Sequence, residues 1–286
     1  MIRLIKKHPK IITFGFVVSF FAGFGQTYLL ALFNGFIQDE MSISRTIIST
    51  IYSVATMASS LLLPGWGRLT DKKSPFTMSI ILGLTLSAGF LLLSLSPNII
   101  LLFLSYLIIR SAGQAAFSLN GSTAISRSFG RFRGKALAVT SVGRSVAEGI
   151  LPITVSFLLV WIGWRMSLVF LAISLPLIFI PLSFYLIKKW LPHPPLYKEL
   201  KELQNSNSEK EHKDWHFAEV AKDYRFYLVA FANTVLPFAL TAIFFQQESL
   251  REANKWSLEL WGSGFTVYAI FQFSFVFLSG HLIDRI

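Results

Sequence analysis

Long apolar runs dominate the sequence of this chain. At a rise of 1.5 Å per residue, about 20 apolar residues in a helix cross a hydrocarbon core about 30 Å thick. The runs that meet this demand are Ile11–Phe33, Thr46–Trp66, Phe76–Ser96, Ile99–Ser122, Ala136–Trp161, Met166–Ile187, Phe226–Gln246 and Leu260–Ser279. They must be helices, because an isolated strand would leave its backbone groups unpaired in lipid. The sequence therefore predicts an all-α, polytopic membrane protein.

The composition agrees with this interpretation and narrows the chemistry. Hydrophobic residues make up 53% of the 286 residues and charged residues only 14%, whereas soluble domains carry roughly 25% charged residues. The chain has no cysteine, which excludes a disulfide framework. His212 and His216 have a spacing that could hold a metal ion, but no carboxylate cluster accompanies them, so we interpret them as solvated loop residues. We expect no metal, no cofactor and no enzyme activity.

The basic residues alternate between the connections of the eight runs. With the N-terminus inside, twenty of the 26 Lys and Arg residues fall on inner connections and four on outer ones. This bias follows the positive-inside rule and predicts a cytoplasmic N-terminus in a cell inner or plasma membrane. The net charge of +11 would suggest nucleic acid in a soluble protein. Here topology explains it, and we expect no nucleic-acid partner.

One long polar stretch divides the runs into two groups. The first six runs lie in residues 1–187, residues 188–225 are rich in charge, and the last two runs lie in residues 226–286. We expect a six-helix transmembrane bundle, a cytoplasmic linker and an incomplete second bundle. Within the linker, Leu196–Leu203 has apolar residues at helical spacing with charges between them, which is typical of a helix on the membrane surface.

Two short segments repeat along the chain. Gly67–Lys72 and Gly280–Arg285 both read Gly-x-Leu-x-Asp-basic, and each follows the second run of its group on an inner loop. The pattern resembles the loop signature of the major facilitator superfamily, whose two six-helix halves each carry it. The resemblance implies a conformational latch, formed here by Gly67, Arg68, Asp71, Lys72, Asp284 and Arg285. The alternative is a tight turn whose charges keep the loop inside.

Other segments resemble the same superfamily. Arg110–Gln114 is similar to its fourth-helix Arg-x-x-x-Gly motif, with the glycine one residue early, and Gly163–Arg165 enters the sixth span as in many members. A looser likeness to the oxalate/formate-antiporter and monocarboxylate-transporter-like members lies in Ser44–Thr46 and Arg131–Ala136. Because the chain stops at Ile286, inside the second signature, the resemblance covers about two-thirds of a twelve-span transporter, and we expect a truncated one.

Three ionised side chains lie inside the apolar runs. A charge at the bilayer centre costs roughly 2.5–3.5 kcal/mol, so it normally has a partner or a purpose. At helical rise, Arg110 and Glu148 each lie about 18–20 Å from the outer ends of antiparallel runs and reach one level. Arg144 lies one turn from Glu148 on the same face. We expect a buried Arg110–Glu148–Arg144 cluster facing a central cavity. Alternatively, Glu148 only neutralises Arg110 while Arg144 extends to the interface.

Such a cluster leaves one positive charge uncompensated. It suits an anionic substrate, because the planar fork of arginine matches a carboxylate. Protonation of Glu148 would release an arginine, which offers a way to couple proton movement to transport. Gln26 and Tyr28 are further candidates for the cavity lining, although a helix–helix hydrogen bond explains each of them equally well.

Together these features favour a secondary active transporter that moves a small solute by alternating access. We expect an organic anion such as a monocarboxylate as the solute, H+ as the coupling ion, and membrane lipid as the surroundings. An ion gradient or exchange supplies the energy, because the sequence holds no Walker-type nucleotide motif. The alternative is a truncated membrane fragment of such a transporter that transports nothing itself.

Overall fold

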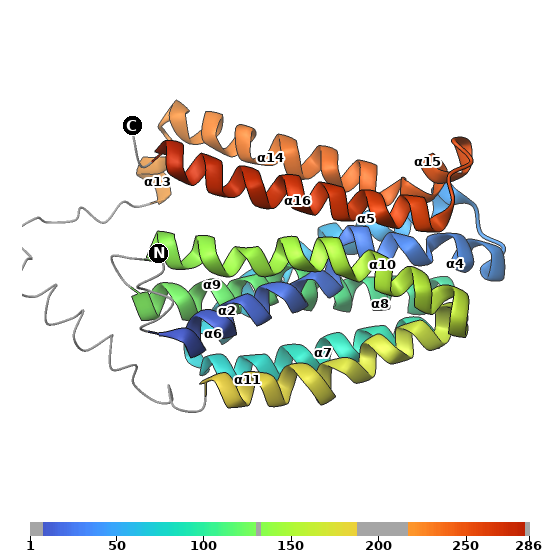
Figure 1. Cartoon of the computed structure of the whole chain (residues 1–286), viewed down its shortest axis with the longest axis horizontal. Coiled ribbons are helices and arrows are strands. Elements are labelled where there is room, and N and C mark those ends of the chain that lie inside the picture. The colour runs from blue at the N-terminus through green and yellow to red at the C-terminus, as the bar shows by residue number, and fades with distance from the viewer. Residues whose placement is uncertain (1–7, 130–132, 188–216, 284–286) are drawn as a thin grey trace, which may run out of the picture.

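The computed structural model describes residues 8–129, 133–187 and 217–283, and every regular element in these ranges is helical (Figure 1). The first part of the chain contains α2 (Pro9–Phe21), η1 (Ala22–Gly25), α3 (Thr27–Leu30), η2 (Ala31–Phe33), α4 (Asn34–Met41), α5 (Arg45–Leu61), α6 (Leu63–Lys72), α7 (Pro75–Ser94), α8 (Ile99–Ile109), η3 (Arg110–Ala116), α9 (Phe117–Phe129), α10 (Arg133–Ser174), η5 (Leu175–Phe179) and α11 (Ile180–Ile187). The second part contains α13 (Phe217–Val220), α14 (Tyr224–Phe245), α15 (Gln247–Ala253) and α16 (Leu258–Ile283). The all-α class predicted from the sequence is confirmed.

The candidate membrane spans are of two kinds, single elements and helix pairs bent at a break. Pro75–Ser94, Ile99–Phe129, Ala136–Ile187 and Tyr224–Phe245 are each long and apolar enough to cross a membrane. Two helix pairs pass the same test when each is taken as one bent span. Pro9–Gly25 meets Thr27–Met41 at 45°, and α5 meets α6 at 41°. The first and second expected spans are therefore interrupted helices.

The fifth and sixth expected spans form one continuous element that reverses at Gly163. This glycine has φ 74° and ψ 168°, a conformation that residues with a side chain rarely adopt. The second arm returns alongside α7 (Figure 1). Trp164 Nε1 donates to Glu40 Oε2 at 2.9 Å, and Arg165 Nη2 donates to Glu40 Oε1 at 2.6 Å. Arg165 also donates to the Ser94 carbonyl oxygen. These contacts fix the turn against α4 and the end of α7.

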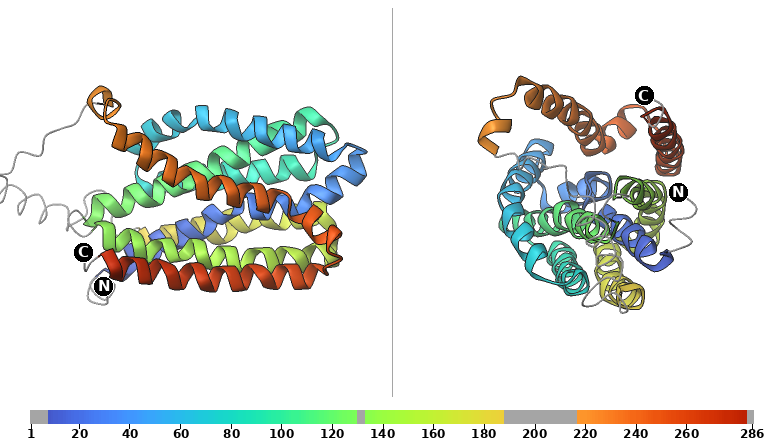
Figure 2. Two further views of the ribbon diagram at one scale, coloured as in Figure 1. Left: turned by 90° about the horizontal axis from the view of Figure 1, so that it is seen from above. Right: turned by 90° about the vertical axis from the view of Figure 1, so that its left-hand side faces the viewer.

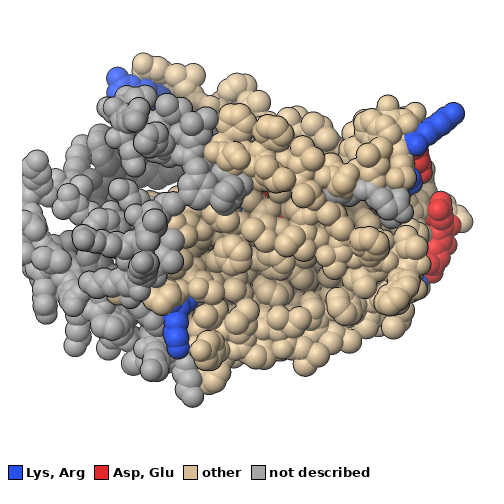
Figure 3. Space-filling model, in the orientation of Figure 1, with Lys and Arg blue, Asp and Glu red and all other residues tan. Residues whose placement is uncertain are grey.

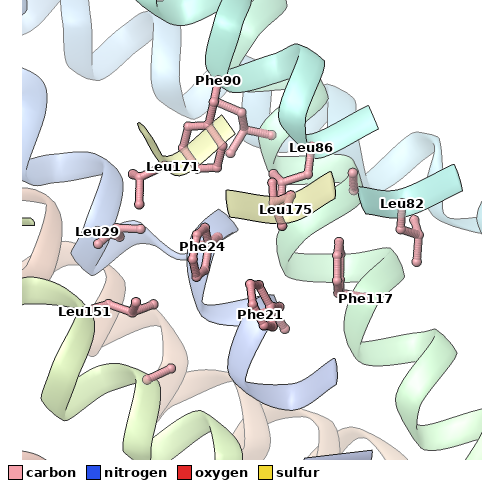
Figure 4. Packing of buried hydrophobic residues seen from close by; sticks show 14 of the residues in the cluster. Phe21, Phe24, Leu29, Leu82, Leu86, Phe90, Phe117, Leu151, Leu171 and Leu175 are labelled. Carbon is pink, nitrogen blue, oxygen red and sulfur yellow. The ribbon is translucent and has the colours of Figure 1, made fainter. Parts of the chain in front are cut away.

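Large apolar side chains fill the space between the helices of the first part (Figure 4). Phe21 and Phe24 stack with ring centroids 5.1 Å apart, and Phe24 meets Phe90 of α7 at 6.3 Å. Phe21 and Phe117 both pack against Phe179 of η5. In lipid, van der Waals packing of this kind joins helices, because the surrounding chains are as apolar as the side chains. The aromatic core therefore holds α2, α7, α9 and η5 together.

The second part lies on one side of the first (Figure 2). α16 packs along α10, whereas α14 meets α3 near its own C-terminal end. Gly149 of α10 permits the close approach, because a Cβ there would lie 3.1 Å from the Cβ of Ala269. Thr266 Oγ1 also donates to the Gly149 carbonyl oxygen at 3.4 Å. The α10–α16 contact is therefore the main junction between the two parts.

The expected linker, residues 188–225, is described only in part. Residues 188–216 lie outside the described residues, and with them the expected surface helix Leu196–Leu203 and the pair His212 and His216. Within 217–225, α13 and the start of α14 are helical, so the seventh span begins at Tyr224 rather than at Phe226. The division into residues 1–187, 188–225 and 226–286 stays a prediction.

One face of the molecule carries almost no charge between its two ends. In the view of Figure 3, the charged side chains gather at the two ends of the molecule, and the face between them is almost free of charge. Among the described residues, many large apolar side chains are exposed, including Phe157, Val160 and Phe238 at 68%, 74% and 75%. A continuous apolar surface of this kind is unfavourable in water and suits contact with lipid hydrocarbon.

Candidate functional site

The first span is interrupted at Gln26. This residue has an extended backbone (φ −84°, ψ 155°) between η1 and α3, so helical hydrogen bonding stops there. Carbonyl groups next to such a break need other donors. Arg110 supplies one, because its Nη1 donates to the Gly25 carbonyl oxygen at 3.0 Å and to Thr27 Oγ1 at 3.3 Å. The cation of the fourth span is therefore anchored in the break of the first.

Arg110 is almost completely buried, with 2% of its surface exposed. Its guanidinium carbon lies 5.2 Å from the ring centroid of Tyr52, and Tyr52 Oη donates to Thr27 Oγ1 at 2.8 Å. Hydrogen bonds and the aromatic ring together lower the cost of burying this charge. The Nε of Arg110 has no hydrogen-bond partner in the protein. One donor of the buried cation is therefore unpaired in the protein.

Two glycines let the helices that carry this site approach each other. A Cβ on Gly25 would lie 2.5 Å from the Gly113 Cα, and a Cβ on Gly113 would lie 2.6 Å from the Gly25 Cα. Gly113 lies in η3, a π-helical segment that begins at Arg110. Single π-helical turns are rare and occur frequently at functional sites. The two glycines therefore bring Arg110 within reach of the break.

A polar cavity of about 710 Å³ adjoins the break. It extends toward the end of the molecule at which α2 begins, since its wall includes the C-terminal half of α5 and the N-terminal half of α10. The wall is rich in hydroxyl and amide groups, and its described residues include two cations and no acid. They are Ser19, Gln26, Thr56, Ser59, Ser60, Leu63, Arg110, Gln114, Ala115, Ser118, Leu119, Ser122, Leu137, Thr140, Ser141 and Arg144.

Arg144 is the second cation of this cavity. Its side chain is exposed, and Nη2 donates to Ser118 Oγ at 3.1 Å. Two guanidinium groups on a wall without an acid produce a positive potential that attracts anions. In the part of the chain that the structure describes, no three His, Cys, Asp or Glu side chains lie together in a way that could hold a metal ion.

Glu148 lies apart from the cavity wall. It is buried on α10, where Gln272 and Tyr268 of α16, Tyr28 of α3 and Arg144 face its carboxyl group. No ion pair joins Glu148 to Arg110 or to Arg144, all three of which the structure describes. In this conformation the three side chains are therefore not joined by ion pairs, and the expected cluster stays a prediction. Arg110 is satisfied by the break in the first span, while Glu148 faces the second part of the chain.

The other polar candidates take different places. Gln26 lies on the cavity wall at the break. Tyr28 is buried, and its ring packs against Phe244 and Phe265 of the second part with centroids 6.1 Å apart in each case. Its hydroxyl has no hydrogen-bond partner in the protein. Tyr52, which touches Arg110 directly, is not among the residues predicted from the sequence, because an aromatic residue in an apolar run does not stand out from the core.

The two parts of the chain meet on the far side of the break. The Tyr52 and Phe245 rings lie 4.5 Å apart between centroids, and the Tyr28 and Phe244 rings lie 6.1 Å apart. These aromatic side chains lie beyond Arg110 as seen from the cavity. The cavity is therefore covered at this end and extends toward the other.

The first signature segment is a helix. Gly67–Lys72 form the second half of α6, whereas the sequence analysis places them on a loop. The helix continues to Lys72 because the first strong breaker is Pro75, where α7 begins. Ser74 then caps α7 by accepting a hydrogen bond from the Thr77 N–H at 3.1 Å. The expected inner loop is reduced to the short connection between these helices.

Within that segment, Asp71 is paired inside the first part of the chain. Its Oδ1 lies 2.8 Å from Nη2 of Arg127 on α9, and both side chains are largely exposed. Arg68 and Lys72 are exposed as well. Asp284 and Arg285 of the second signature lie outside the described residues. In this conformation, Asp71 therefore binds its own bundle.

Apolar helices around a polar, cationic cavity define a membrane transport protein. The family model of the Major Facilitator Superfamily matches residues 15–286, which is nearly the whole chain, so the chain belongs to this superfamily. Its members are secondary transporters of small solutes and not enzymes, and the chain is an integral, multi-pass membrane protein. A comparison with curated proteins gives no match.

Proposed function

We propose that the chain carries a small organic anion across the membrane by alternating access, with Arg110 and Arg144 as the binding residues. One observation supports this most directly: the cavity wall holds two arginines and, among its described residues, no acid. A charged side chain within a membrane is costly and generally serves a function. Because the guanidinium group can donate two parallel hydrogen bonds to a carboxylate, a monocarboxylate is the simplest substrate.

The two arginines have different tasks in this proposal. Arg110 is fixed by Gly25 and Thr27, so it defines the deep end of the site, and its unpaired Nε points to a missing acceptor. Arg144 is exposed and donates to the Ser118 hydroxyl, so it can turn toward a solute that enters the cavity. The hydroxyl and amide groups of the wall supply further hydrogen bonds to the oxygen atoms of the solute.

We further propose that H+ is the coupling ion and that Glu148 binds it. The carboxyl group is faced by Arg144 from its own helix, by Gln272 and Tyr268 from α16, and by Tyr28 from α3. When Glu148 is ionised, it attracts Arg144 away from the cavity. When Glu148 is protonated, Arg144 is released to the anion. Binding of the proton and binding of the anion then support each other.

The distribution of basic residues supports a cytoplasmic N-terminus. The cavity then opens toward the cytoplasm, and the state with Asp71 bound to Arg127 is the one open to the inside. In the opposite state, we propose that Asp71 and its neighbours Gly67, Arg68 and Lys72 engage the second bundle, whose own signature includes Asp284 and Arg285. Such an exchange of ion pairs is a common switching element. It would join bundles made of residues 1–187 and 226–286 through the linker 188–225.

Binding of acids and of matched neutral compounds tests the proposal. The purified protein in detergent is heated with formate, lactate, pyruvate, oxalate or malate, and in parallel with the corresponding uncharged amides. We expect at least one acid to raise the midpoint of thermal unfolding while its amide does not, because a bound ligand stabilises the folded state. Equal effects of acid and amide would contradict an anion site. A folded protein that neither binds nor takes up any organic acid would favour the alternative, a membrane protein without transport activity.

A further inference from the structure

The break in the first span is bound from two sides. On the cavity side, Arg110 donates to the Gly25 carbonyl oxygen and to Thr27 Oγ1. On the opposite side, Gln247 of α15 donates from Nε2 to the Tyr28 carbonyl oxygen at 2.9 Å. The backbone around Gln26 is therefore held by one side chain of the first part and by one of the second.

Gln247 is a fully buried amide in the short helix between α14 and α16. It is 0% exposed, and its Oε1 accepts a hydrogen bond from Trp261 Nε1 at 2.9 Å. Burial of an amide is unfavourable unless its polar groups are paired, and here both ends are paired. The amide thus joins the backbone of α3 to the first turn of α16. It lies in the contact between the two parts that closes this face of the molecule, which we call the closure.

An exposed ion pair crosses the same closure. Arg45 Nη2 lies 2.7 Å from Glu252 Oε2, but the two side chains are 51% and 53% exposed. Exposed pairs contribute little, because water competes for both charges. The hydrogen bonds of Gln247 are shielded from water, so breaking them costs more free energy than breaking the exposed ion pair. Of these two links, Gln247 is therefore the one that can control the closure.

We infer that Gln247 is a positioning residue for transport. It couples the contact between the two parts to the break in the first span and, through the break, to the binding of a ligand at Arg110. The inference rests on the proposed function in taking the cavity as the solute site. A carboxylate is a stronger acceptor for a guanidinium group than a backbone carbonyl or a hydroxyl. An anion at Arg110 therefore competes with Gly25 and Thr27. The break then changes shape, and the Tyr28 carbonyl no longer presents the same acceptor to Gln247.

The thermodynamic requirement is that the anion distinguishes the closed from the open arrangement. A ligand shifts a conformational equilibrium only by its difference in affinity for the two states. Here that difference arises because Arg110 has protein acceptors in the closed state, and an anion must displace them. Packed interfaces switch between discrete arrangements, so loss of the Tyr28–Gln247 hydrogen bond favours opening of the whole face.

Thiol labelling tests the inference, because the chain contains no cysteine. Ala31 of η2 is 1% exposed and lies on the segment that packs against α15, so Ala31→Cys reports opening of this face. Its reaction with a membrane-impermeant maleimide is compared between Gln247→Ala and Gln246→Ala. Gln246 is the adjacent, exposed glutamine and serves as the matched control. We expect Gln247→Ala to speed labelling by about ten-fold and Gln246→Ala to leave it unchanged. Equal rates in the two variants overturn the inference.

A second arm tests the link to the cavity side. Tyr52→Phe removes the hydroxyl that donates to Thr27, which also accepts from Arg110, and thereby loosens the part of the break that Arg110 holds. We expect it to speed Ala31→Cys labelling about three-fold when Gln247 is present and to have no further effect in Gln247→Ala, because connected residues are not additive. Two independent, multiplicative effects would show that Gln247 only packs the closure. Labelling needs no transported solute, so a failed uptake assay would overturn the proposed function without deciding this outcome.

Discussion

Arg110 Nη1 lies 3.0 Å from the Gly25 carbonyl oxygen, which joins the buried cation of the fourth span to the backbone break of the first. The contact explains two features at once. It gives a buried charge a stable place without an acid beside it, and it holds the first span bent by 45°. The cation and the break therefore form one structural unit, and the cavity wall is built around it.

The close approach of Gly25 and Gly113 leads to a prediction about stability. We expect Gly25→Ala to destabilise the protein by about 1–3 kcal/mol. Its Cβ would lie 2.5 Å from the η3 backbone, which cannot move aside as a flexible side chain can. Gly65→Ala is the control, since a Cβ there meets nothing within 4 Å. The measurement is denaturant or thermal unfolding in detergent. Equal stability of the two variants would contradict the packing described at the break.

The Gly163 turn depends on Arg165 more than the contact between the two parts of the chain depends on Arg45. Arg165 binds Glu40 and the Ser94 carbonyl oxygen, whereas Arg45 has one exposed ion pair. We expect Arg165→Leu to lower stability by about 1–3 kcal/mol, and Arg45→Leu by less than about 1 kcal/mol. Thermal unfolding of both variants under the same conditions checks the order. A larger loss in Arg45→Leu would reverse this ranking.

Asp71→Asn should separate stability from transport. The Asp71–Arg127 pair is 70% and 47% exposed at its side chains, so its loss is expected to change stability by less than about 1 kcal/mol. If Asp71 also binds the second bundle in the outward-open state, we expect Asp71→Asn to lower uptake about five-fold or more, a change typical of energetically coupled sites. The control is Arg127→Gln, which removes only the partner seen here. Normal uptake by Asp71→Asn would show that the segment is a structural helix end and not a latch.

The pH dependence of uptake tests the role of Glu148. In the wild-type protein we expect uptake to increase as the pH falls, because protonation of Glu148 releases Arg144 to the anion. Glu148→Gln cannot ionise, so its uptake should lack this dependence and resemble that of the protonated wild type. Tyr28, Tyr268 and Gln272, which also face the carboxyl group, are unchanged in this variant. A pH profile that stays the same in Glu148→Gln would exclude Glu148 as the proton site.

Composition and periodicity were sufficient to predict the helical membrane fold. The apolar runs start within a few residues of the helices, as with Tyr224 against the expected Phe226, but α4, α6 and α9 continue beyond the expected ends. The break at Gln26 was not predictable from hydropathy, because the apolar run continues through it. Gly23 and Gly25 were the available signals, but glycine in a membrane helix more often marks close packing.

The geometry of the charged residues was harder to predict. Helical rise predicts the position of Arg110 and Glu148 along their helices but says nothing about the rotation of each helix around its axis. The π-helical turn that begins at Arg110 changes this rotation for the residues after it. Glu148, on another helix, faces Gln272 of α16, and no local pattern could indicate a relationship between residues more than 100 positions apart.

Uptake of a carboxylate into proteoliposomes by Arg110 variants tests the central claim most directly. The probe is the acid that stabilises the wild-type protein in the thermal assay, and the control is Arg133→Gln, which makes the same charge change at an exposed position. We predict that Arg110→Gln lowers uptake by about 10–100-fold, that Arg110→Lys recovers it only in part, and that Arg133→Gln retains it. Each variant must first elute as a monodisperse, folded protein. Wild-type uptake by folded Arg110→Gln would contradict the account.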